Sequence, residues 1–152
     1  MTKELLAALG IMGVCVVIHV TGIAFLGEQL IRQREKIEER IGFGWATLLL
    51  IAIFSVVILL HVGEAAIWAG FYARAALFKD FETSFYFSLK SYSTVGYGDV
   101  LLPPNWRLLG TLEAVSGVLL CGLSAAFLFA IVDALFRFRV KRLRRQLHKT
   151  QS

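Results

Sequence analysis

The residues whose types and spacing suggest chemistry form one short run, Thr94-Val95-Gly96-Tyr97-Gly98. A small cation that enters a narrow passage must lose its water. Rings of backbone carbonyls, with a threonine hydroxyl at the inner end, replace that water. Consecutive carbonyls can face one axis only if alternate residues take backbone angles that a Cβ disfavours and glycine tolerates. Gly96 and Gly98 supply this alternation, so we expect Val95 and Tyr97 to point away from the axis and to pack the run against the helix before it.

The run occurs once, in a chain of 152 residues that has no internal repeat. Four copies of such a run close a carbonyl ring around one axis. We therefore expect a homotetramer around a central pore, with potassium ions held in turn at Thr94, Val95, Gly96 and Tyr97. Potassium would be a permeant ion, and the sequence predicts neither a cofactor nor a catalysed reaction.

Three long apolar runs and one short aromatic helix must position these residues. Hydrophobic residues make up 57% of the chain, too many for an ordinary soluble domain of this size. Residues 5–26, 43–72 and 106–136 are each long enough to span a bilayer. A helix over 81–93, capped by Asp80, is too short and must enter the membrane and return among protein. The predicted fold class is an all-α membrane protein with three transmembrane helices, a re-entrant pore helix and a selectivity filter.

The expected regions follow from these runs. Residues 1–27 form an extra N-terminal transmembrane helix, 28–42 a charged connection, 43–136 the pore domain and 137–152 a basic tail. Within the pore domain, 43–72 is the outer helix, 81–93 the pore helix, 94–98 the filter and 106–136 the inner helix. A cleaved signal peptide is the alternative for the first region. It fits less well, because Lys3 is offset by Glu4 and the apolar run is too long.

Basic residues determine the expected orientation. The tail after residue 136 is rich in lysine and arginine and has no acid, and the charged connection also contains several basic residues. Both should be cytoplasmic, which places the N-terminus and the filter loop on the outer side of the cell membrane. Because apolar runs accompany the net charge of +5, anionic lipids rather than nucleic acids are the expected partners of the tail.

Residues 93–99, Ser-Thr-Val-Gly-Tyr-Gly-Asp, are similar to the signature of the potassium-channel pore family. The resemblance covers residues 43–136 and implies passive potassium conduction. Trp106-Arg107 resembles the start of the family's inner helix, and Gly117 resembles its hinge glycine. Close helix packing is an equal alternative for Gly117.

Lys90 departs from the family pattern, because some members carry an acid at this place on the pore helix. A buried lysine without a partner is costly. We therefore expect an ion pair between Lys90 and Asp99 that supports the filter from behind. Glu64 and Glu113 are rival partners, and a lysine that reaches the outer surface is the other alternative.

His61 and Glu64 lie one helical turn apart in an apolar span. Ionisable residues in such a place often mark a function. The pair is therefore either a proton sensor or a hydrogen-bonded structural pair, and two ligands are too few for a zinc site. His19, alone on the first span, is expected to be merely packed.

One stripe of the inner helix should line the pore cavity. In steps of four it contains Gly117, Cys121, Ala125, Phe129 and Asp133. Phe129 is a candidate hydrophobic constriction, and Asp133 could attract cations at the inner mouth. The alternative for Asp133 is a surface pair with Arg137. Cys121 and Cys15 are otherwise expected to be small apolar residues of packed helices.

Three other functions compete with a potassium-selective channel. They are a weakly selective cation channel in which Lys90 alters the filter, a non-conducting subunit of another channel, and an intramembrane enzyme using His19, His61 and Glu64. The enzyme would lack a nucleophile. The first span has no spaced arginines, so strong voltage gating is not expected. The gating stimulus and the role of the first span are not given by the sequence.

Overall fold

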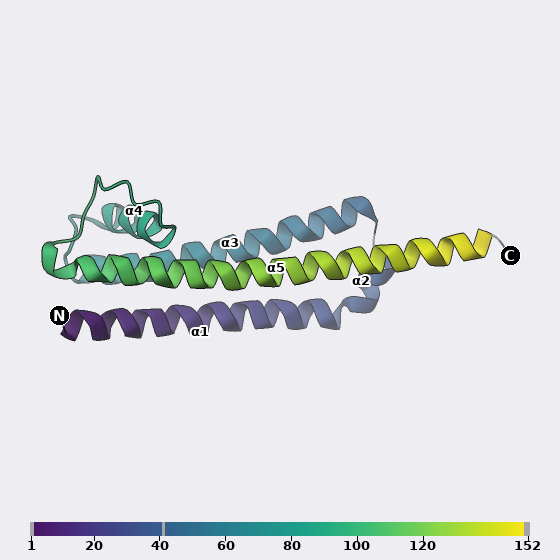
Figure 1. Ribbon diagram of the computed structural model, residues 1–152, viewed down its shortest axis with the longest axis horizontal. Helices are drawn as coiled ribbons and strands as arrows, with labels where there is room; N and C mark the ends of the chain where they lie inside the picture. Colours follow the sequence, from purple (N-terminus) through teal and green to yellow (C-terminus); the bar gives the residue numbers. More distant parts are fainter. Residues whose placement is uncertain (1, 41, 151–152) are drawn as a thin grey trace.

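The computed structural model describes residues 2–40 and 42–150, which are largely helical. In chain order the helices are α1 (Thr2–Arg32), α2 (Arg34–Arg40), α3 (Phe43–Arg74), α4 (Phe81–Tyr92), a short 3₁₀ turn (Pro104–Trp106) and α5 (Arg107–Thr150). The described residues contain no strand, which confirms the all-α class. In Figure 1 the three long helices form a bundle, with α4 and the N-terminus at one end and the C-terminus at the other.

The long helices α1, α3 and α5 are apolar enough to cross a membrane over Glu4–Arg32, Gly44–Arg74 and Pro104–Arg144. Many of their large apolar side chains face outward; Leu59 and Leu119, for example, are 68% and 65% exposed. Such a surface is stable when lipid or other protein covers it. The three predicted spans are therefore confirmed as those of a multi-pass membrane protein.

The helices extend beyond the apolar runs. α1 continues to Arg32, whose side chain pairs with Glu28 at 2.9 Å, and residues 34–40 of the charged connection form α2. α5 continues from the third span through the basic tail to Thr150. Glutamate, lysine and arginine have good helix propensity, so charged segments can prolong a helix that an apolar segment has begun.

The short helix α4 begins at Phe81 because Asp80 caps it, as predicted. The Asp80 carboxylate accepts a hydrogen bond of 2.7 Å from the backbone N–H of Thr83, and this N–H lowers the pKa of Asp80 below its usual value. Phe87 of α4 packs edge-on against Tyr72 of α3, with ring centroids 5.4 Å apart. The cap fixes where α4 starts, and the aromatic contact fixes it against α3.

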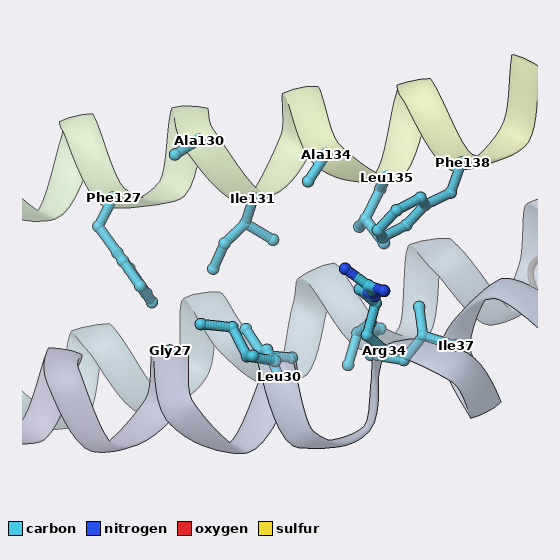
Figure 2. Close-up of a pocket in the computed structure, with 12 residues that line it drawn as sticks. Gly27, Leu30, Arg34, Ile37, Phe127, Ala130, Ile131, Ala134, Leu135 and Phe138 are labelled. Carbon is cyan, nitrogen blue, oxygen red and sulfur yellow. The ribbon is translucent and has the colours of Figure 1, made fainter.

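At the opposite end, a second apolar cluster holds α2. Ile37 of α2 and Leu135 of α5 are buried together against Trp45 of α3. Beside this cluster lies a pocket of about 230 Å³, lined mainly by apolar side chains of α1, α2 and α5. Figure 2 shows the Arg34 side chain reaching from α2 toward Leu135 and Phe138 of α5. The pocket is thus apolar, with a cationic group at one end.

Candidate functional site

The run Thr94–Gly98 follows α4 as irregular backbone whose φ angles alternate in sign. φ is +61° at Thr94, +55° at Gly96 and +77° at Gly98, whereas Val95 and Tyr97 do not have positive φ. An alternating backbone of this kind can turn successive carbonyls toward one side, as ion coordination by carbonyl rings requires. Thr94 extends the pattern beyond the two glycines, although positive φ strains a β-branched residue by about 1–3 kcal/mol.

Backbone hydrogen bonds hold the start of the run against the end of α4. The N–H of Thr94 donates to the carbonyl of Ser91 at 2.9 Å, and the N–H of Gly96 donates to the carbonyl of Lys90 at 3.3 Å. The last turn of α4, the negative end of its dipole, therefore adjoins the run. A cation beside Thr94 would be stabilised by that end of the helix.

The side chains of Val95 and Tyr97 are largely uncovered in the single chain. Val95 is 51% exposed and Tyr97 is 75% exposed. A single chain thus encloses neither side chain. The expectation that they pack the run against its pore helix stays a prediction.

Lys90 lies behind the run and is almost completely buried. Its ammonium forms an ion pair with Asp99 and donates a 3.1 Å hydrogen bond to the carbonyl of Val100. Tyr86 donates to the other carboxylate oxygen of Asp99 at 2.7 Å. Hydrogen bonds from Lys90 and Tyr86 lower the pKa of Asp99 to about 2. The structure thus brings together the two residues that the sequence paired, and the rival partners of Lys90 bind other groups.

Glu113, one of those rivals, joins three helices beneath the run. Its buried carboxylate on α5 accepts a hydrogen bond of 2.6 Å from Tyr72 of α3 and another from Ser88 of α4. The sequence suggested Glu113 only as a rival partner of Lys90. Its actual partners could not be predicted, because they come from two other helices. These bonds fix α4 against both flanking spans.

At Gly117 the helix α5 closely approaches the end of α4. A Cβ built at Gly117 would lie 2.1 Å from the backbone oxygen of Tyr92, the last residue of α4. This distance supports the close-packing interpretation of Gly117. Gly117 is buried, and in this it differs from the other residues of the predicted cavity stripe.

The other stripe residues lie on a more open face of α5. Cys121, Ala125 and Phe129 are exposed, and Phe129 is 75% exposed. Asp133 forms the surface ion pair with Arg137 that was the alternative to a free acid at the inner mouth. Cys15 is buried as expected, whereas Cys121 is exposed in the single chain, as its place on the predicted cavity stripe would allow.

A second polar cluster connects all four main helices below the run. His19 of α1 contacts Glu64 of α3 through Nδ1 at 2.7 Å and Ser124 of α5 through Nε2 at 2.9 Å. His61 of α3 contacts Ser124 at 3.0 Å and the hydroxyl of Tyr92, from α4, at 2.9 Å. Tyr92 in turn donates to Glu64.

The expectation that His19 is merely packed is therefore wrong. His19 and Glu64 are completely buried, and the predicted His61–Glu64 pair, 3.5 Å apart, is part of a larger network. The available signal was that His19 is an ionisable residue in an apolar span. The sequence could not show that His19 lies on the face of α1 that is turned toward Glu64 and Ser124.

The three spans, the re-entrant helix and the alternating run together define a pore-forming membrane protein. The family model described as "Ion channel" matches residues 46–134, more than half of the chain. The chain belongs to this family, in agreement with the resemblance to potassium-channel pores. Membership indicates a channel rather than an enzyme. No curated protein and no solved structure matched the chain.

The match leaves out α1 and α2 and also ends before the basic part of α5. It includes α4, the Thr94–Gly98 run and both flanking spans. The buried histidine of α1 is therefore an addition to the matched unit, although it is hydrogen-bonded to residues within that unit.

Proposed function

We propose that the protein is a potassium-selective channel in which four chains surround one pore. The observation that carries the proposal is the sign alternation of φ through Thr94, Gly96 and Gly98. Four such runs would present rings of carbonyl oxygens that replace the hydration shell of potassium. Potassium then flows passively down its electrochemical gradient, and no bond is made or broken.

The exposure of Val95 and Tyr97 supports the tetrameric part of the proposal. Both side chains are apolar or aromatic, yet about half or more of each is uncovered in one chain. In a four-fold arrangement, a neighbouring subunit would cover them and stiffen the filter. Other exposed apolar residues of α5, such as Leu119 and Phe129, would meet neighbours or lipid.

The proposed orientation places the N-terminus outside and the C-terminus in the cytoplasm. It is supported by the location of the N-terminus and α4 at one end of the bundle, with the basic end of α5 at the other (Figure 1). An accessibility assay on intact cells, with single cysteines near each end, tests this directly. Labelling of a cysteine in the basic tail from outside would contradict it.

The proposed function is tested by recording from the purified chain in planar bilayers, with potassium on one side and sodium on the other. We expect currents that reverse near the potassium equilibrium potential. Reversal near zero would contradict selectivity and favour a weakly selective cation channel. An absence of current across pH and voltage would contradict autonomous conduction and favour a non-conducting subunit.

The first substitution to test in these recordings is Lys90→Met. It removes the cation that binds Asp99 and Val100 behind the filter, so we expect a severalfold lower open probability at pH 7. In the unsubstituted chain the low pKa of Asp99 keeps the ion pair charged from pH 7 down to about 4, and its contribution is lost only as the pH falls toward about 2. Currents should therefore be insensitive to this pair over pH 7–4.

Lys79→Met is the matched control, because Lys79 is an exposed lysine in the loop just before α4. It should leave the open probability unchanged. Equal behaviour of the two variants would refute the filter-supporting role of Lys90. A loss of current with an apparent pKa near 4 that is absent in Lys90→Met would contradict the low pKa of Asp99.

We also propose that an anionic phospholipid occupies the pocket beside Arg34. The pocket's apolar lining suits an acyl chain, and the guanidinium at its end suits a phosphate (Figure 2). Arg34→Gln should reduce the anionic lipid that copurifies with the chain, measured by mass spectrometry. Arg32→Gln is the control, because Arg32 is an exposed residue paired with Glu28. Equal lipid content in both variants would exclude the pocket as the binding site.

A further inference from the structure

We propose that His19, His61 and Glu64 form a binding site for a divalent transition metal of the zinc class. Each residue offers one ligand atom, and these atoms all lie within 4.8 Å of one another. The site is separate from the proposed potassium path, and its metal chemistry does not depend on conduction. It adds a third ligand, His19, to a pair that alone was too small to hold zinc.

The ligand types favour this class of metal. Two imidazoles and one carboxylate form a common set of three protein ligands for zinc, with a fourth position left to water or another oxygen. Magnesium and calcium prefer oxygen ligands, whereas imidazole suits zinc, copper, nickel and iron. The His–His–Glu composition therefore distinguishes the site from one for the permeant ion or for a hard divalent cation.

The geometry requires only small side-chain movements. Zinc–ligand bonds of about 2.0–2.1 Å place tetrahedral ligand atoms roughly 3.4 Å apart. His19 Nδ1 is 2.7 Å from Glu64 Oε1, and His61 Nδ1 is 3.5 Å from Glu64 Oε2, so the two distances lie on either side of this spacing. Small side-chain rotations of His19, His61 and Glu64 would place one ligand atom of each around a common centre.

The surroundings supply what a buried metal site needs. Ser124 Oγ contacts Nε2 of both imidazoles, at 2.9 and 3.0 Å, on the side of each ring away from Nδ1. It would therefore orient both rings, and water would take the fourth position on the metal. Tyr92 donates to the Glu64 carboxylate and orients it. The charge of the metal would be partly neutralised by Glu64, which lowers the cost of placing it among apolar helices.

The site would also give α1 a defined role. His19 comes from α1, outside the matched channel unit, whereas His61 and Glu64 come from α3 within it. Their common neighbour Tyr92 ends α4, two residues before Thr94. A bound metal would therefore fasten the added span to the helix that carries the proposed filter.

The test is metal analysis of the purified full chain in detergent. The protein is loaded with Zn²⁺, freed of unbound metal by gel filtration and analysed by elemental mass spectrometry. We expect one zinc ion per chain, and a loss of at least about tenfold in zinc affinity for His19→Gln and for His61→Gln. Because the readout is metal content, it is independent of whether the chain conducts potassium.

Two matched controls remove other donors from the chain. His148→Gln eliminates the histidine of the basic tail, and Cys121→Ser eliminates the exposed thiol. Both should retain the bound zinc. No bound zinc in the unsubstituted chain, or zinc that is lost in a control but kept in His19→Gln, would overturn the proposal.

Cobalt spectroscopy provides a second test that needs no substitution, in case the histidine variants do not fold. Co²⁺ bound to the unsubstituted chain should give the intense visible bands of a four-coordinate nitrogen and oxygen site. Zinc added afterwards should abolish these bands. A weak spectrum like that of aqueous Co²⁺, or a thiolate charge-transfer band, would show that these three residues do not bind the metal.

Discussion

Replacing Gly96 by alanine is expected to abolish potassium current in planar bilayers. Gly96 has φ of +55°, a conformation that costs an L-residue with a Cβ roughly 1–2 kcal/mol. In a tetramer this strain is repeated in every subunit. It would relax by rotating the peptide planes beside Gly96, which turns carbonyl oxygens away from the pore axis and removes ligands for potassium.

The structure separates this effect from a general folding defect. Apart from the two adjacent residues, the nearest heavy atom to a Cβ built at Gly96 is the Thr94 carbonyl oxygen, 4.0 Å away, so alanine meets no steric obstacle from the rest of the chain. The variant should therefore remain folded and keep the elution volume of the unsubstituted protein in size-exclusion chromatography. Gly63→Ala, in an open part of α3, is the control and should conduct normally. Potassium-selective current from Gly96→Ala would refute the proposed filter.

The features that depended on local sequence were predicted well. Asp80 caps α4 because a cap is made by one side chain and a backbone N–H three residues later. The spans follow from the length of their apolar runs. Gly96 and Gly98 signalled the backbone alternation, because glycine is the residue that tolerates positive φ.

The features that depended on how helices face one another were not predicted. His19 contacts Glu64, 45 residues away, and Ser124, 105 residues away, and an apolar helix carries no mark of which face it turns to its neighbours. Thr94 has positive φ although a β-branched residue disfavours it, since hydrogen bonding to α4 outweighs its local preference. Val95 is 51% exposed, and the sequence pattern that marks it as a packing residue does not say how much of it the single chain covers.

Replacing Gly117 by alanine should destabilise the protein. The new Cβ would lie 2.1 Å from the Tyr92 carbonyl oxygen and 2.9 Å from its carbonyl carbon, and both are backbone atoms that no side-chain rotation can move. α5 would have to withdraw from the end of α4, where overpacking of this kind costs about 1–3 kcal/mol. We expect a clear fall in Tm, measured by the intrinsic fluorescence of the detergent-solubilised protein during heating.

Gly122→Ala is the matched control for this prediction. It places the same methyl group on the same helix, where a Cβ meets no heavy atom within 4 Å, and alanine improves helix propensity. Its Tm should be unchanged or higher.

The comparison also separates close packing at Gly117 from the alternative, a hinge. A hinge would lose flexibility without losing packing, so Gly117→Ala would then keep its Tm and alter only the open probability in bilayer recordings. A lower Tm in Gly117→Ala alone would instead show that this glycine is needed to hold α5 against the carbonyl end of α4.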